Sequence, residues 1–176
     1  MRAGGGHSVI AVPVMELDDV IRDRTARYDS SFVSADPTFA HAHITLLGPW
    51  LDFPTHDDLL TVADVLASEA PFSFELDEVG EFGDGTLHLL PEPAGPFHRL
   101  ITRLAASFPQ TPPYAGRYAD VVPHLTFEHR LTGASAAGIR SELGDRLPVR
   151  ARAERVDLQW WANHDCHVQH SWRLGR

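Results

Sequence analysis

The chain has 176 residues, 43% of them hydrophobic, and a formal net charge of −9. This composition supports a packed core and excludes wholesale disorder, and the acidic balance argues against binding along an extended nucleic-acid backbone. No apolar run approaches the ~20 residues of a membrane span. The single cysteine and the lack of an apolar signal segment in residues 1–6 lead us to expect a cytoplasmic protein without internal disulfides.

Apolar periodicity predicts alternating strands and helices along the chain. In the first half we expect a strand at 7–14, a helix at 16–28, a loop at 30–39, a strand that begins at 41 and stops at Gly48-Pro49, a helix at 55–70, and a hairpin of strands at 72–79 and 86–90. Residues 91–96 form a proline-rich break. In the second half we expect a helix at 97–108, a loop at 110–119, a strand at 121–127, a weaker helix at 134–147, and closing strands at 149–161 and 167–174.

The two halves share a short motif, His-x-Thr, within an apolar strand. Residues 43–45 read His-Ile-Thr, and residues 124–126 read His-Leu-Thr. Because side chains alternate along a strand, the histidine and the threonine of each motif share one face and the apolar residues take the other. The symmetry of the two halves predicts that the two motifs lie opposite each other across a cleft.

Two facing imidazoles form an acid–base pair, because an ordinary histidine titrates near pH ~6.5. On a phosphodiester, the neutral imidazole would accept a proton from water or a hydroxyl, and the protonated one would donate a proton to the leaving oxygen. The hydroxyls of Thr45 and Thr126 would hold the non-bridging oxygens. This chemistry needs no metal ion.

The motif pair resembles the signature of the 2H phosphoesterase superfamily, which includes 2′-5′ RNA ligase-like proteins and cyclic phosphodiesterases. The match rests on residues 43–45 and 124–126 with their apolar neighbours, and residues 172–175 resemble how many members end. The resemblance implies an α+β fold of two pseudo-symmetric lobes, each an antiparallel sheet with helices packed on its outer face, and an active-site cleft between them. It also implies metal-independent, cofactor-free action on 2′,3′-cyclic or 2′-5′-linked nucleotide phosphates.

We therefore predict a single bilobal domain over residues 1–176 that opens 2′,3′-cyclic phosphates or acts on 2′-5′ linkages. His43 and His124 are the predicted catalytic pair, and Thr45 and Thr126 are the predicted phosphate ligands. The expected partner is a small nucleotide or an RNA end, no membrane partner is expected, and a monomer is favoured. Which histidine is the acid and which is the base does not follow from the sequence.

Other side chains are candidates for supporting roles. His41 shares the face of His43, and Arg117 and Tyr118 precede the second motif, where they could clamp phosphate and stack on a base. Glu128 shares the expected face of His124 and could orient its imidazole. Two alternatives stay open: a nucleotide-binding module of the same fold without turnover, and a zinc-dependent hydrolase that uses the His and Cys residues of segment 164–170.

Overall fold

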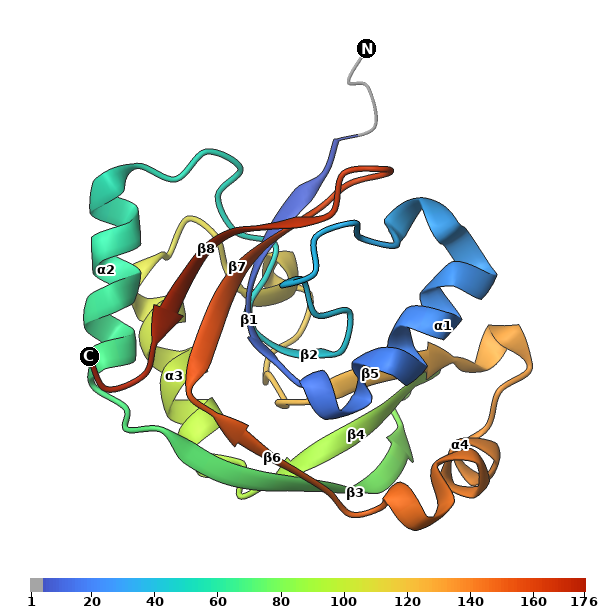
Figure 1. Cartoon of the computed structure of the whole chain (residues 1–176). Helices are drawn as coiled ribbons and strands as arrows, with labels where there is room; N and C mark the ends of the chain where they lie inside the picture. The colour runs from blue at the N-terminus through green and yellow to red at the C-terminus, as the bar shows by residue number, and fades with distance from the viewer. Residues whose placement is uncertain (1–4) are drawn as a thin grey trace.

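The computed structural model describes residues 5–176; residues 1–4, part of the segment considered for a signal sequence, lie outside the described residues. Strands and helices alternate along the described chain (Figure 1). The strands are β1 (His7–Pro13), β2 (His43–Leu47), β3 (Phe72–Glu81), β4 (Thr86–Glu92), β5 (Leu125–His129), β6 (Val149–Ala153), β7 (Arg155–Trp161) and β8 (His167–Arg173). The α-helices are α1 (Asp18–Asp29), α2 (His56–Ala67), α3 (Gly95–Ser107) and α4 (Ala136–Leu143).

All eight strands form one antiparallel sheet in the order β6-β3-β4-β5-β2-β1-β7-β8. One half contains β1, β2, β7 and β8, and the other contains β3 to β6. The halves join where Ile44 of β2 pairs with Leu125 of β5. The predicted α+β class is confirmed, with one refinement: the two motif strands are hydrogen-bonded neighbours in a continuous curled sheet, rather than members of two separate sheets (Figure 1).

The predicted strand at 149–161 is wrong, because the segment forms two strands at opposite sides of the sheet. β6 pairs with β3 at one edge, whereas β7 pairs with β1 in the other half. The chain crosses between the halves at Glu154, whose carbonyl accepts the backbone N–H of Leu174. The buried apolar positions shift by one residue at this crossing, from Val149, Ala151 and Ala153 to Val156 and Leu158, and the prediction of a single strand overlooked this shift.

Other element boundaries shift by a few residues. The predicted helix at 134–147 ends at Leu143, because Gly144 adopts a positive φ of 48° that breaks the helical path. The predicted strand at 121–127 begins only at Leu125, so His124 lies just before β5 rather than within it. The strand predicted from residue 41 begins at His43.

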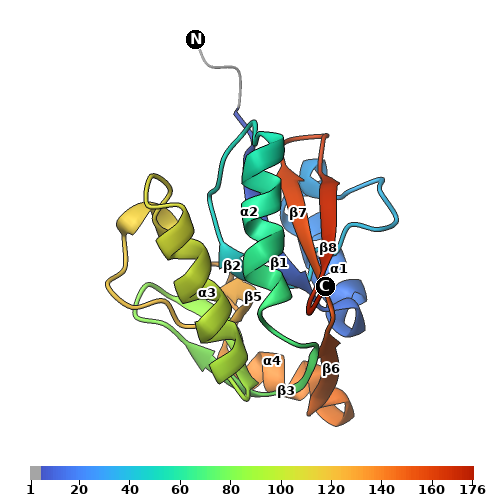
Figure 2. The ribbon, with the colours of Figure 1, turned by 90° about the vertical axis from the view of Figure 1, so that its left-hand side faces the viewer.

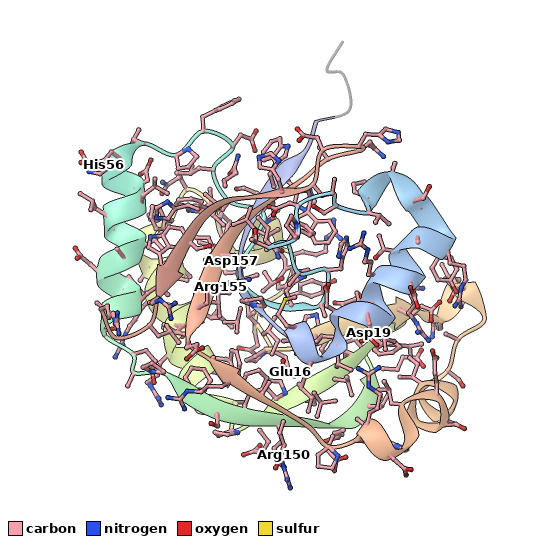
Figure 3. All side chains as sticks on the ribbon, viewed as in Figure 1. Glu16, Asp19, His56, Arg150, Arg155 and Asp157 are labelled. Atoms are coloured by element: carbon pink, nitrogen blue, oxygen red, sulfur yellow. The ribbon has the colours of Figure 1, made fainter. Side chains whose placement is uncertain are left out.

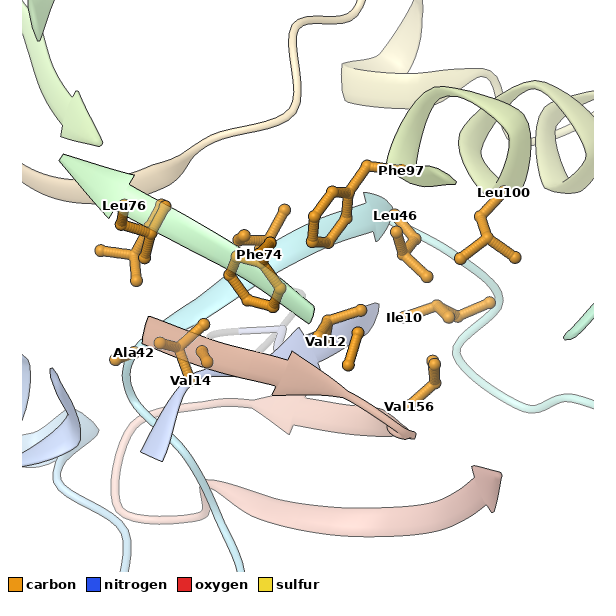
Figure 4. Packing of buried hydrophobic residues seen from close by; sticks show 14 of the residues in the cluster. Ile10, Val12, Val14, Ala42, Leu46, Phe74, Leu76, Phe97, Leu100 and Val156 are labelled. Carbon is orange, nitrogen blue, oxygen red and sulfur yellow. The ribbon is translucent and has the colours of Figure 1, made fainter. Parts of the chain in front are cut away.

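Buried apolar residues from both halves form one core enclosed by the curled sheet (Figure 4). Phe74 of β3, Val12 of β1 and Phe97 of α3 all contribute to it. The Phe97 ring packs edge-on against Phe72 and Phe74, at centroid distances of 5.0 and 5.1 Å. Helices α2 and α3 lie side by side on one flank (Figure 2). No helix of residues 5–176 is both long and apolar enough to span a membrane.

On the opposite flank, Arg24 of α1 joins α4 to β5. Its guanidinium donates to Glu128 at 3.0 Å, forms a two-point ion pair with Glu142, and lies 4.2 Å from the centroid of the Phe127 ring. The Arg24 and Glu128 side chains are 8% and 5% exposed, whereas Glu142 is 49% exposed. The buried half of this cluster therefore depends on Arg24 to neutralise Glu128.

A polar network on β7 fixes the loop that leads into β2. The buried Asp157 carboxylate accepts hydrogen bonds from Arg155 at 2.9 Å and from Ser171 at 2.6 Å (Figure 3). Burial raises the pKa of Asp157, and these partners oppose the rise. Arg155 also donates to the Thr38 carbonyl at 3.1 Å, and Gln159 donates to the Ala40 carbonyl at 2.7 Å. The backbone just before His43 is thereby held against the sheet.

Candidate active site

The strand register brings the two His-x-Thr motifs together. Ile44 pairs with Leu125 in an antiparallel arrangement, and the same register continued by one residue each way would place His43 opposite Thr126 and Thr45 opposite His124. Opposed residues share a face, so all four side chains project to the same side. In this register the two histidines are diagonal neighbours, which lie roughly 7–8 Å apart with their Cβ atoms somewhat closer. A phosphoryl group fits between imidazoles at that separation.

Each histidine makes the same hydrogen bond to its own backbone. The Nδ1 of His43 lies 2.9 Å from the His41 carbonyl, and the Nδ1 of His124 lies 2.7 Å from the Val122 carbonyl. Since a carbonyl only accepts, Nδ1 carries the proton in both rings, and Nε2 is left to accept or donate the proton that chemistry requires.

Burial lowers the pKa of both histidines. For His43 desolvation is the largest cause, the positive charge of a protonated His124 acts in the same direction, and the pKa falls to about 4. Desolvation also lowers the pKa of His124, opposed by its hydrogen bond to Val122. His43 is therefore neutral at pH 7 and suited to accept a proton.

Aromatic rings outside the set of predicted site residues surround the two histidines. Trp161 of β7 lies 5.5 Å from His43, measured between ring centroids. Around His124 the rings of Phe82, His88 and Tyr114 lie at 4.9, 5.9 and 6.3 Å. Of these residues only His88 has a local signal in the sequence. Residues 86–88 read Thr-Leu-His, which is the His-x-Thr motif in reverse order.

A pocket of about 700 Å³ opens beside His124 and Thr126. Two of the predicted substrate contacts, Arg117 and Tyr118, line it, and the Tyr118 hydroxyl donates to Asp84 at 3.0 Å. Tyr114 also lines the pocket. Its backbone has a positive φ of 52°, and its N–H donates to the Gly48 carbonyl at 2.7 Å, which anchors this loop beside β2.

The family model of the 2′-5′ RNA ligase superfamily matches residues 17–165. The chain belongs to this superfamily. The match confirms the resemblance that the paired motifs indicated.

Solved structures share the fold of this superfamily member. E. coli LigT in complex with 3′-AMP aligns with a TM-score of 0.58 at 16% identity, covering 97% of this chain and 99% of LigT. TT0787 of Thermus thermophilus aligns with a TM-score of 0.56 at 18% identity, covering 96% and 98%. A protein described as a phosphoesterase aligns with a TM-score of 0.58 at 13% identity, covering 97% and 99%. A search of curated proteins found no match. At these identities the likeness shows a shared fold.

In this superfamily member His41 lies beneath the site rather than on its open face. The side chain is 1% exposed, and its Nε2 accepts the Ser34 N–H at 3.1 Å. The His41 backbone N–H donates to Asp18 at the start of α1, and its carbonyl accepts from the His43 ring. This placement favours a positioning role for His41 over the predicted substrate contact.

Glu128 does not share the face of His124, because a β-bulge intervenes. In the β4–β5 ladder Thr126 pairs with His88 and Glu128 pairs with Leu87, so Phe127 is the extra residue. The bulge turns Glu128 toward Arg24 of α1. Glu128 is thus an ion-pair partner of Arg24 rather than the predicted orienting partner of His124.

The His and Cys residues of segment 164–170 do not converge. The buried Cys166 thiol donates to the Ala162 carbonyl at 3.3 Å, His167 pairs with Asp165, and His170 packs on Trp172. Within the part of the chain that the structure describes, no three His, Cys, Asp or Glu side chains are arranged to hold a metal ion. The zinc alternative has no ligand set there.

Proposed function

We propose that this superfamily member is a metal-independent phosphoesterase that opens 2′,3′-cyclic phosphates, or cleaves 2′-5′ linkages, on nucleotides or RNA ends. The observation that carries the proposal is the register of β2 and β5. The pairing of Ile44 with Leu125 brings the middle residues of the two motifs side by side, which supports one shared site for both histidines and both threonines.

In this mechanism His43 is the general base, because its imidazole is neutral at pH 7. Its Nε2 takes a proton from water as the water oxygen attacks phosphorus. As the bond between phosphorus and the ribose oxygen breaks, protonated His124 donates its Nε2 proton to that oxygen. Hydrogen bonds from Thr45 and Thr126 stabilise the charge on the non-bridging oxygens. Solvent then returns both histidines to their starting states.

The pocket beside His124 suits the nucleoside part of such a substrate. Aromatic rings at its wall, including Tyr114 and Tyr118, offer stacking surfaces for a base, and Arg117 supplies a cation for a second phosphate. LigT, which shares the fold, has been observed with 3′-AMP. The acidic net charge of −9 favours a small substrate over a long RNA.

The test is turnover of the four 2′,3′-cyclic nucleotides in the presence of EDTA. We expect activity in the wild type and in a His170→Ala control, which removes an exposed histidine, and loss of activity in His43→Ala and His124→Ala. Binding without turnover in the wild type would indicate the nucleotide-binding module instead. Activity that disappears only on chelation would indicate a metal-dependent hydrolase.

A further inference from the structure

His88 lies next to the catalytic pair without belonging to either motif. It pairs with Thr126 across the β4–β5 ladder, and the residue is buried, with 3% of its surface exposed. Its ring stacks on Phe82 at a centroid distance of 3.7 Å and an interplanar angle of 18°. The His124 ring stands at 87° to Phe82 and at 71° to His88. The stacked pair therefore forms a wall against one side of the His124 imidazole.

His124 has less backbone support than His43. His43 lies within β2 and pairs with Pro13 of β1. His124 precedes β5, the β4–β5 ladder begins at Leu125, and none of the ladder pairs of residues 5–176 includes His124. The segment that leads to it is a long loop between α3 and β5. The orientation of its ring therefore depends on the side chains around it.

Gly80 makes room for the His88 ring. Gly80 pairs with His88 across the β3–β4 ladder, and a Cβ atom at this position would lie 2.9 Å from His88 Nε2. The opposite ring nitrogen, Nδ1, donates to the Thr86 carbonyl at 3.2 Å. The ring is thus confined between the backbone of β3 and the face of Phe82, so any side chain at residue 80 would displace it.

We propose that His88 is a positioning residue for His124. Stacked on Phe82 and packed over Gly80, its ring holds the His124 imidazole with Nε2 directed at the phosphate. His88 acts through His124, because its own Nε2 faces Gly80. The inference rests on the proposed function where it concerns turnover, but the state of the His124 ring can be measured in the protein without substrate.

Removing the His88 ring also has a defined effect on the titration of His124. Burial is the main cause of the lowered pKa of His124, and the neighbouring His88 acts in the same direction. Leucine at residue 88 has a similar size and keeps His124 buried, but it removes the effect of the His88 charge, so His124 should titrate at a higher pH. The titratable groups that face His124 are His88 from β4, Asp84 from the β3–β4 turn, His43 from β2 and Tyr114 from the loop.

The experiment compares His88→Leu, which removes the ring, with Gly80→Ala, which displaces it. We expect kcat on a 2′,3′-cyclic nucleotide to fall about 10- to 100-fold in both variants with KM nearly unchanged, as for a misplaced catalytic group. Histidine NMR titration without substrate should show His124 titrating at a higher pH in His88→Leu and an altered His124 environment in Gly80→Ala. Gly95→Ala at the start of α3 is the matched control, since its Cβ meets only the flexible Arg99 side chain, at 3.5 Å.

A kcat within about twofold of wild type together with an unchanged His124 titration would overturn the proposal. If His88→Leu does not fold, Gly80→Ala decides the outcome, because it retains every side chain of the cluster. If the wild type turns over none of the cyclic nucleotides, the proposed function fails, while the NMR titration still tests whether His88 positions His124.

Discussion

The neutral state of His43 should make the stability of the protein depend on pH. Burial lowers the pKa of His43 from 6.5 to about 4. Between these values the unfolded chain binds a proton that the folded protein does not, so the free energy of unfolding decreases as pH falls from 6.5 toward 4. The gap between the two pKa values corresponds to about 3 kcal/mol, of which about 2 kcal/mol is lost by pH 5.

The test is urea unfolding followed by tryptophan fluorescence at pH 8 and pH 5. His43→Gln removes the titrating group but retains an amide that can donate to the His41 carbonyl. The wild type should lose about 2 kcal/mol more stability than this variant between the two pH values. A shifted histidine that is not coupled to His43, such as His7, contributes equally to both proteins and cancels.

A His170→Gln variant, which removes an exposed histidine, should show the same pH dependence as the wild type. An equal loss of stability in wild type and His43→Gln would refute the reasoning, because His43 would then not be held neutral by burial. That result would also remove the physical reason for assigning His43 as the general base.

Three further predictions concern the ion-pair cluster and the proposed chemistry. Arg24→Met should lower the free energy of unfolding by about 3–5 kcal/mol, because it leaves the buried Glu128 carboxylate without its cationic partner. Glu142→Gln should lower the free energy of unfolding by less than about 1 kcal/mol, because Glu142 is half exposed. Urea denaturation measures both. Thr126→Val should lower kcat about 100-fold with little change in unfolding, because the side chain is exposed and its loss removes a hydrogen bond to the charged oxygens; steady-state kinetics beside a circular dichroism melt separates the two effects. The profile of kcat/KM against pH should be a bell with an acid limb near pH 4, where the base becomes protonated, and an alkaline limb below pH 6.5, where the buried acid loses its proton; a flat profile between pH 5 and 8 would contradict a two-histidine mechanism.

The sequence could predict the parts of the site that depend on local periodicity. Residues two positions apart in a strand lie on the same face. The prediction that the histidine and threonine of each motif share a face therefore needed no knowledge of the tertiary structure. The same rule failed for Glu128, because the extra residue Phe127 shifts the alternation after Thr126. A bulge depends on the partner strand, and one strand read alone does not contain it.

The aromatic neighbours of the two histidines could not be predicted from the sequence for a related reason. Phe82, His88, Tyr114 and Trp161 come from four segments that only the strand order brings together, and only His88 has a local signal, its spacing from Thr86. The apolar positions shift by one residue at Glu154, but this shift does not indicate which strand each segment joins. The chemistry of the motifs could be predicted, whereas the identity of their neighbours depended on long-range topology.

Because the chain crosses between the halves at Glu154, one half of the sheet is an insertion in the sequence of the other half. Strands β3 to β6 are consecutive in the sequence. The strands of the other half come from two separate segments, β1 and β2 before them and β7 and β8 after them. During synthesis on the ribosome, β1 can pair with its second neighbour, β7, only after most of the chain has been made. Trp161, which packs against His43, is therefore among the last site residues to be synthesised. Until then β1 presents an unpaired edge, the kind of surface that recruits foreign strands. A nascent chain is therefore most vulnerable to aggregation while its first strand is already made and its seventh is not.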